Sequence, residues 1–379
     1  MDRWSWPARF AAFAAIFAFC LVVFGAFVRL SHAGLSCPDW PTCYGQASWP
    51  SHEQDIAVAN QAFPERAVEN HKTWREQGHR MVAGTLGVLI LALALTAAWR
   101  RKTDVAVLVV AAVAAAIGVA CYISGAHTVS VLCSLVALAL PIIVAARMNR
   151  AAPWRIAVIL LSVVTFQAML GMWTVTWLLK PVVVMGHLLG GLTTFGLMSY
   201  VALRLSGVGA DDDHWAATRK LVAIGLFLLG LQIALGGWTS ANYAALTCGL
   251  DFPTCQGQWW PKTDFHEGFV LWRGIGVNYE GGILDVAARN AIQVTHRIGA
   301  LIVFCYLGWL SHRLSRQGLR VPAIALGLGL VVQVGLGIAN VKLALPMPVA
   351  LGHVSVAVLL LFTLIFILAR MQRRVTAQA

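Results

Sequence analysis

Long apolar stretches separated by short polar segments dominate the pattern of the chain. About 20 consecutive apolar residues are enough to cross the hydrocarbon core of a bilayer, and we find ten stretches of about this length. The pattern therefore predicts an all-α polytopic membrane protein with about ten transmembrane helices. The predicted spans are residues 10–30, 79–99, 105–123, 129–146, 155–176, 182–203, 221–240, 292–311, 321–341 and 348–369.

Composition and charge agree with this class and add an orientation. The 379 residues are 59% hydrophobic and only 12% charged, with no segment long enough to fold as a separate soluble domain. Of the 28 Lys and Arg residues, about 17 fall on the side of the N-terminus if the ten spans are crossed in turn. The protein is therefore expected in the inner membrane of a bacterium, with both termini in the cytoplasm. The net charge of +12 does not indicate nucleic-acid binding, because the basic segments carry no interleaved aromatic residues.

Two similar apolar helix–turn–helix segments carry a histidine at matching positions. His187 follows Gly171 by 16 residues, and His353 follows Gly337 by the same distance. A glutamine precedes each histidine by 20 residues, at Gln167 and Gln333. A histidine at membrane depth is costly without a partner, so each is a candidate for function.

Two long loops with paired cysteines repeat in the same way. Cys37 and Cys43 lie in the first loop, and Cys248 and Cys255 in the second. In each case, the first cysteine comes 12 residues after a helix glycine, and the loop leads into a helix that begins with a His-Arg pair. These pairs are His79-Arg80 and His296-Arg297. The sequence therefore predicts an internal duplication.

The duplication sets the expected domain organisation. We expect an N-terminal four-helix repeat at residues 1–204, a cytoplasmic linker at 205–218 and a C-terminal four-helix repeat at 219–379. The first repeat is longer by a surplus that lies at about residues 103–150, which is rich in Ala, Val and Leu. An inserted helical hairpin fits the length of this surplus. It also keeps His187 on the same side of the membrane as His79, which a single extra crossing would not.

Four histidines at one depth suggest a metal carried by a cofactor. A zinc or copper site gathers three or four ligands at one point, whereas each half here supplies two histidines on different helices. Two histidines from facing helices fit the axial positions of a haem iron, and flanking glycines such as Gly190 make room for the flat ring. One bis-histidine haem site is therefore expected in each half. Arg80 and Arg297 are candidates for binding haem propionates or for interfacial positions.

Several of these residues together resemble the haem A synthase family, whose members make haem A for cytochrome oxidases. The resemblance rests on Arg29–Cys37, the Glu76-x-x-His79 step, the Lys180-Pro181…His187 segment, His296 and His353. It covers nearly the whole chain, but the family has eight helices, so the hairpin is a departure.

The resemblance implies a function and a division of roles. His296 and His353 would bind a permanent haem B, and His79 and His187 would form the site for the substrate, haem O. The enzyme would be an oxidoreductase acting on a CH3 group, since the C8 methyl of haem O becomes a formyl group. Candidate partners are haem O synthase, cytochrome oxidase assembly factors and a second copy of the chain, while the electron-transfer partner stays open.

Glu76 is the candidate catalytic residue of the first half. It lies one helical turn before His79, on the same face, and the matching residue of the second half is the uncharged Gln293. A carboxylate near a haem edge could stabilise developing positive charge or handle protons. The alternative is an interfacial carboxylate that pairs with Arg75 or Arg80.

The outer cysteines and the competing functions leave alternatives open. Four cysteines allow three pairings; local disulfides Cys37–Cys43 and Cys248–Cys255 are favoured, and the resemblance keeps open a redox role for the first pair.

The competing functions are a di-haem membrane electron-transfer protein of the quinol-oxidising type and a haem-handling assembly factor. Haems extracted from the purified protein would separate the three functions.

Overall fold

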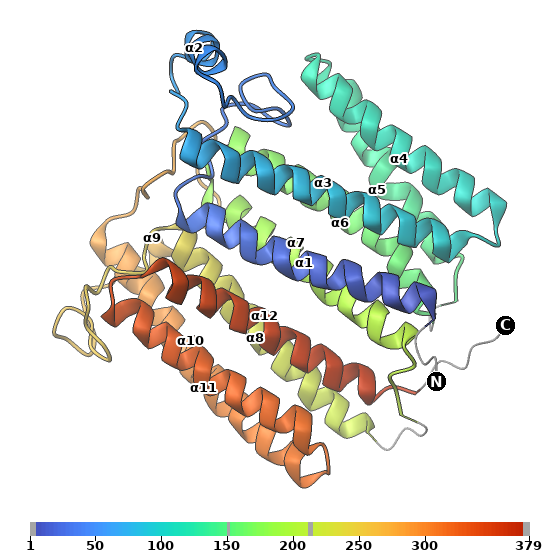
Figure 1. Cartoon of the computed structure of the whole chain (residues 1–379). Coiled ribbons are helices and arrows are strands. Elements are labelled where there is room, and N and C mark those ends of the chain that lie inside the picture. Colours follow the sequence, from blue (N-terminus) through green and yellow to red (C-terminus); the bar gives the residue numbers. More distant parts are fainter. Residues whose placement is uncertain (1–4, 150–151, 211–214, 374–379) are drawn as a thin grey trace. The chain divides into compact units, whose positions relative to one another are not determined.

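The structure is a computed structural model that describes residues 5–149, 152–210 and 215–373. Within these ranges the chain is helical, and β-pairing is limited to isolated bridges. Ten of the described helices are long and apolar enough to cross a membrane, and Figure 1 labels each of them. They are α1 (Trp6–Leu30), α3 (Asn70–Ala98), α4 (Lys102–Ile123), α5 (His127–Ala146), α6 (Pro153–Thr176), α7 (Pro181–Leu205), α8 (Ala216–Ala241), α10 (Val286–Arg316), α11 (Arg320–Lys342) and α12 (Met347–Arg370). The predicted all-α polytopic fold with ten spans is confirmed, and the chain is a multi-pass membrane protein.

The chain divides into two compact units. The first contains residues 1–176 and 190–209, and the second contains residues 177–189 and 210–373. Helix α7 belongs to both, because its first turns group with the second unit and the rest groups with the first. The expected repeat boundaries, 1–204 and 219–379, stay a prediction. Part of the expected linker, residues 211–214, lies outside the described residues.

The first unit is built on four helices. Helix α3 packs between α1 and α6. Helix α7 contacts α1 through Phe195, whose ring centroid lies 6.1 Å from that of Phe19. It also contacts α6, where the Gln167 side chain lies over Gly190. This arrangement puts α7 against both of the helices that flank α3.

The inserted hairpin is present as predicted. Helices α4 and α5 pack against each other, and α5 also packs on α6, so the pair lies at the side of the bundle in Figure 1. At one end, the buried Asp104 carboxylate lies 3.6 Å from the Arg101 guanidinium and 3.9 Å from that of Arg147. At the other end, Tyr122 makes an edge contact with Trp40 of the first cysteine loop, with ring centroids 5.8 Å apart. The ion pairs therefore hold together the base of the hairpin itself, whereas Tyr122 attaches its tip to the first cysteine loop.

The second unit contains a four-helix bundle. Helices α8, α10, α11 and α12 form a closed ring in which each packs against two of the others. Its core is made of aliphatic side chains from all four helices, among them Val222, Leu307, Leu326 and Leu364, all fully buried. Close packing of such side chains between helices stabilises a membrane bundle mainly through van der Waals contacts.

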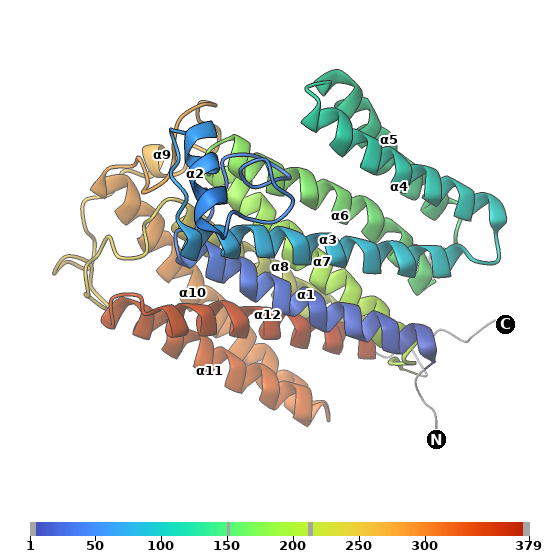
Figure 2. The same cartoon turned by 45° about the horizontal axis from the view of Figure 1, so that its top comes forward.

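The cysteine loops lie at the start of α3 and of α10. The first loop also carries the short helix α2 (Glu53–Ala62), and the second carries α9 (Phe265–Gly268). Figure 2 shows the first loop and α2 above the N-terminal end of α3. Each loop has one cis peptide bond before proline, Trp40-Pro41 and Phe252-Pro253. Each also has a short antiparallel bridge, between Cys43 and Gln46 and between Cys255 and Gln258. The two loops thus share backbone conformation as well as residue types.

The turns before α7 and α12 are also alike. Leu178 and Leu179 have φ values of 49° and 59°, and Ala344 and Leu345 have values of 59° and 61°. Two consecutive non-glycine residues in the left-handed region are uncommon. In both turns they reverse the chain just before a helix that carries a histidine.

Candidate functional site

His79 lies on α3 with its imidazole turned toward a glycine of α1. A Cβ atom at Gly25 would lie 2.9 Å from Nε2 of His79. The ring of Phe24 makes an edge contact with the same imidazole, with centroids 5.6 Å apart. Glycine at position 25 therefore lets the imidazole, whose Nε2 can bind iron, pack closely against α1.

His296 lies on α10 and has the same relation to α8. A Cβ atom at Gly236 would lie 3.3 Å from Cε1 of His296. The Gln232 amide donates to the His296 carbonyl at 2.9 Å, and its nitrogen lies 3.0 Å from Nδ1 of the imidazole. The glutamine thus fixes the orientation of the ring from one helical turn below Gly236.

His353 lies on α12 against α11. Its Nδ1 donates to the backbone carbonyl of Gln333 at 3.2 Å. This hydrogen bond makes Nε2 the nitrogen that carries the lone pair, the form in which a neutral imidazole binds metals. A Cβ atom at Gly337 would lie 3.1 Å from Cε1, and the Gln333 amide nitrogen lies 3.2 Å from Nε2. The glutamine that precedes His353 by 20 residues is therefore in direct contact with it.

The second unit has features that fit a haem ligated by His296 and His353. The two imidazoles lie near enough to interact electrostatically. The amide oxygens of Gln232 and Gln333 are buried without a hydrogen-bond partner, which is costly inside a protein. Each imidazole faces a glycine of a neighbouring helix. Among the described residues, no group of three or more His, Cys, Asp or Glu side chains could hold a metal ion.

His187 lies in the first turns of α7, which group with the second unit. The neighbouring Leu188 and Met185 pack over Gly237 of α8. His79 belongs to the other unit, so its pairing with His187 stays a prediction. The space beside Gly190, expected to receive the haem ring, is taken in this structure by the Gln167 amide.

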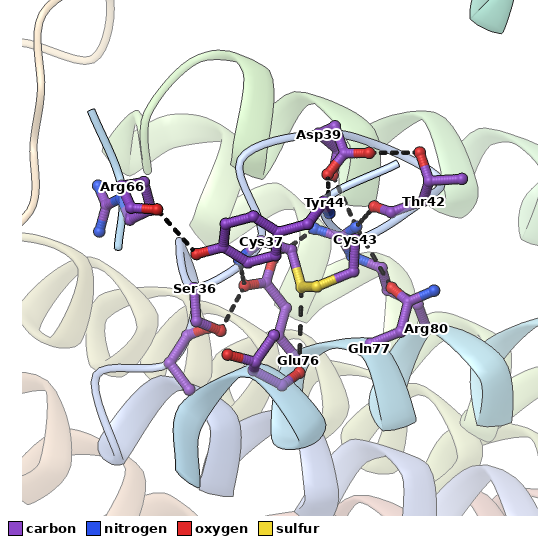
Figure 3. The surroundings of a disulfide bond; sticks show 12 residues. Ser36, Cys37, Asp39, Thr42, Cys43, Tyr44, Arg66, Glu76, Gln77 and Arg80 are labelled. Atoms are coloured by element: carbon purple, nitrogen blue, oxygen red, sulfur yellow. Dashed lines mark hydrogen bonds and ion pairs between the residues drawn. A yellow bond between two sulfur atoms is a disulfide. The ribbon is translucent and has the colours of Figure 1, made fainter. Parts of the chain in front are cut away.

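Glu76 is buried and holds the first cysteine loop. The residue is only 4% exposed to solvent. One carboxylate oxygen accepts hydrogen bonds from the Ser36 hydroxyl at 2.9 Å and from the Cys37 N–H at 2.8 Å. The other forms an ion pair with Arg80 at 2.5 Å. Figure 3 shows these contacts beside the disulfide. Of the two partners considered from sequence, the structure selects Arg80.

The two arginines next to the helix-opening histidines hold the cysteine loops. Arg80 donates to the carbonyls of Asp39 and Thr42 at 2.8 and 2.7 Å. Arg297 donates to the carbonyls of Pro253, Thr254 and Asp251 at 3.1, 2.8 and 2.9 Å. Their expected role in binding propionates stays a prediction, but much of their hydrogen-bonding capacity is used by loop carbonyls.

Both local disulfides are present. The Cα atoms of Cys37 and Cys43 are 4.8 Å apart, and those of Cys248 and Cys255 are 4.6 Å apart. All four cysteines are buried. Near the first disulfide, burial raises the pKa of Tyr44 to about 12, and Arg66 opposes that rise. The disulfide loop is thus packed as well as cross-linked.

The second loop is attached to its helix without a carboxylate. Gln293, the counterpart of Glu76, donates to the Ala245 carbonyl at 3.3 Å. Asn290 accepts from the Thr247 hydroxyl at 2.7 Å and donates to the Lys262 carbonyl at 3.1 Å. Amides therefore do in this half what the Glu76–Arg80 pair does in the first. The acidic group is not needed for attaching such a loop.

Comparison with known proteins identifies the family. The family described as cytochrome oxidase assembly protein, COX15-CtaA, matches residues 8–134 and 122–365. The chain is also 36% identical over 301 residues to the heme A synthase of Shewanella oneidensis, a match that covers 79% of this chain and 76% of that protein. The chain belongs to the COX15-CtaA family. The resemblance inferred from sequence motifs is thereby confirmed.

Two features of this COX15-CtaA member were not predicted from sequence. Gln232 had no role assigned, although an amide inside an apolar span, four residues before Gly236 on the same helix face, is itself a signal. Gly25 was noted only as a marker of the repeat. Its contact with His79 depends on how α1 and α3 pack, which a pattern within one helix does not specify.

Proposed function

We propose that the chain is a haem A synthase that oxidises the C8 methyl group of haem O to a formyl group. The observation that carries this proposal is the match to a heme A synthase over 79% of the chain. The imidazole geometry supports it, because histidines from different helices face glycines, as flat rings ligated by two histidines would require.

His296 and His353 are the proposed axial ligands of a resident haem B. When bound, this haem supplies a one-electron redox centre. Gln232 and the Gln333 carbonyl orient the two imidazoles, which is the usual role of groups hydrogen-bonded to metal ligands. His79 and His187 are the proposed ligands of the substrate haem O.

Glu76 is the proposed catalytic carboxylate. It lies one helical turn from His79 and, with Arg80, Ser36 and the Cys37 N–H as donors, is held in one orientation. A fixed negative charge stabilises positive charge that develops when a methyl group beside the ring is oxidised. The absence of any acid at position 293 supports the first half as the reacting half.

The proposed location is a bacterial inner membrane, with both termini in the cytoplasm and the cysteine loops in the periplasm. Two disulfides in these loops agree with an oxidising compartment. The product would serve terminal oxidases, in line with the family's description as cytochrome oxidase assembly proteins. Haem O synthase is the proposed supplier of substrate.

The test is conversion in cells that make haem O but no haem A. The chain is expressed there, and haems are extracted and separated by chromatography. Haem A should appear with the chain and be absent with an empty vector. Extracts that contain only haem O and haem B, from cells in which the protein is folded and present in the membrane, would contradict the proposal and favour an electron-transfer or haem-handling role.

A further inference from the structure

Lys180 is a buried cation without an acidic partner. It lies in the turn before α7 and is 0% exposed. Among the described residues, no hydrogen-bond acceptor reaches its ammonium group. Its ammonium group lies over two indole rings, that of Trp272 with its centroid at 3.4 Å and that of Trp177 at 5.2 Å. Burial lowers the pKa of this amine.

This placement is unfavourable in three respects. A buried charge is costly unless it is paired, and lysines at helix ends in membranes normally extend to the interface. In addition, Lys180 is the residue whose carbonyl accepts the first hydrogen bonds of α7, from the N–H groups of Val183 and Val184 at 2.9 and 3.1 Å. The N-terminal end of a helix carries partial positive charge and favours anions. Cation–π contacts with tryptophan offset such costs only in part.

The fold of the turn does not require the lysine. The equivalent turn before α12 has the same two left-handed residues, Ala344 and Leu345, and is followed by Pro346 at the position of Lys180. A local feature that weakens a structure without a structural need is expected at a functional site.

On the segment that carries Trp272 over Lys180, the acid nearest in sequence to Trp272 is Glu267, which already forms an ion pair. Trp272 is followed by Arg273, which forms an ion pair with Glu267 at 2.7 Å. The loop is fixed to the turn by a hydrogen bond from the Tyr279 N–H to the Leu178 carbonyl at 3.0 Å. The loop therefore covers the ammonium group with an indole ring and leaves the positive charge available to an anion.

We propose that Lys180 binds a propionate carboxylate of the haem that His187 ligates. This inference rests on the proposed function and names a contact of its substrate. Seven residues separate Lys180 from His187, which is two helical turns, so both point from the same face and lie about 10 Å apart along the axis. An ammonium group and a helix N-terminus together form an anion site, and a propionate projects from the ring edge while the iron is held at its centre. On binding, the ammonium exchanges the Trp272 ring for a charge-assisted hydrogen bond.

The test compares two porphyrins that differ in the charge of their propionates, since both propionates are ionised in iron protoporphyrin and both are methylated in its dimethyl ester. Protein is purified from cells that make no haem O and retains its second-half haem. It is titrated with iron protoporphyrin and with the dimethyl ester of iron protoporphyrin, and absorbance reports binding at the first-half site. The variants are Lys180→Met, Lys180→Arg as a charge-retaining rescue, and Lys342→Met. Lys342 is the control because it lies at the C-terminal end of α11, next to the equivalent turn before α12, and is exposed.

Wild type and Lys342→Met should prefer the free acid over the ester by about 10-fold or more, in line with one hydrogen bond between charged groups. Lys180→Met should lose most of this preference because its affinity for the free acid falls toward that for the ester, and Lys180→Arg should recover part of the preference. The second-half absorbance verifies folding, and replacing a buried unpaired charge by an apolar side chain is often tolerated.

An unchanged preference in Lys180→Met would overturn the inference, as would a change confined to the second-half haem. If Lys180→Met fails to fold, the titration of the wild type tests the inference. Equal affinity of the wild type for the free acid and the ester would overturn it. These outcomes leave the proposed function intact as long as the protein still converts haem O. Failure of wild type to bind either porphyrin at the first-half site would overturn both.

Discussion

Replacing Gly25 by alanine should remove haem from the first-half site without destabilising the protein. The added Cβ would lie 2.9 Å from Nε2 of His79 and would push the imidazole away from its position against α1. Ordinary contacts of this kind begin at about 3.4 Å, so the approach is too close by roughly 0.5 Å. An imidazole free of iron can move aside, but one that is bound to iron cannot.

The magnitude follows from the costs of overpacking. Inserting one methyl group into a filled site costs about 1–3 kcal/mol, which corresponds to roughly a 5- to 150-fold loss of haem affinity. Helix α1 itself should gain up to about 1 kcal/mol, because alanine is the better helix former. Loss of binding and retained or increased stability are therefore expected together.

The assay measures haem content by visible absorbance, and stability by the midpoint of thermal unfolding. Gly84→Ala is the matched control, since a Cβ at this α3 position would have no neighbour within 4 Å. It should keep both haems. If Gly25→Ala binds first-half haem as tightly as Gly84→Ala does, the assignment of Nε2 of His79 as a ligand is wrong.

Three further predictions concern charge, ligand orientation and pH. Glu76→Gln should lower haem A formation about 100-fold or more, and haem O should accumulate in the extracted pigment. Gln293→Glu, the reverse change at the matching position of the second half, should alter neither haem A formation nor haem O content. Normal haem A output from Glu76→Gln would show that the carboxylate has no part in the reaction. Gln232→Leu should weaken second-half haem binding by about 10- to 100-fold, because it removes the group that orients His296, and unchanged haem B retention on dialysis would refute this. Native Tyr44 keeps its proton up to pH about 12 while an unfolded tyrosine loses it near 10, so stability should fall by up to about 2.7 kcal/mol between these values; a Tyr44→Phe variant with an equally steep fall in its unfolding midpoint would contradict the assignment.

The spans and the inserted hairpin were predictable from sequence, for a simple physical reason. Membrane helices are selected by their length and hydropathy, and both are local properties of the chain. The predicted span 129–146 became α5, His127–Ala146, with ends that differ by two residues or fewer. Matching cysteine spacing likewise predicted the two local disulfides, because residues six and seven positions apart can meet in one short loop.

Contacts between distant segments were harder to predict. Nothing in the spacing of Arg80 indicated that its guanidinium would bind carbonyls of the loop that precedes α3, since this depends on how the loop folds back. The same applies to Glu76, which sequence placed near a haem edge and the structure places against the disulfide loop. The division of α7 near Leu189 also depends on packing, because α7 is one continuous helix there and nothing in its sequence marks a boundary.

The most direct test of the account is the pigment content of four single variants, His79→Ala, His187→Ala, His296→Ala and His353→Ala, purified from cells that make haem O. The account predicts that the first two lose haem O and haem A but keep haem B, and that the last two lose haem B. Loss of haem B in His187→Ala, or its retention at the wild-type level in both His296→Ala and His353→Ala, would contradict the proposal that each half ligates its own ring.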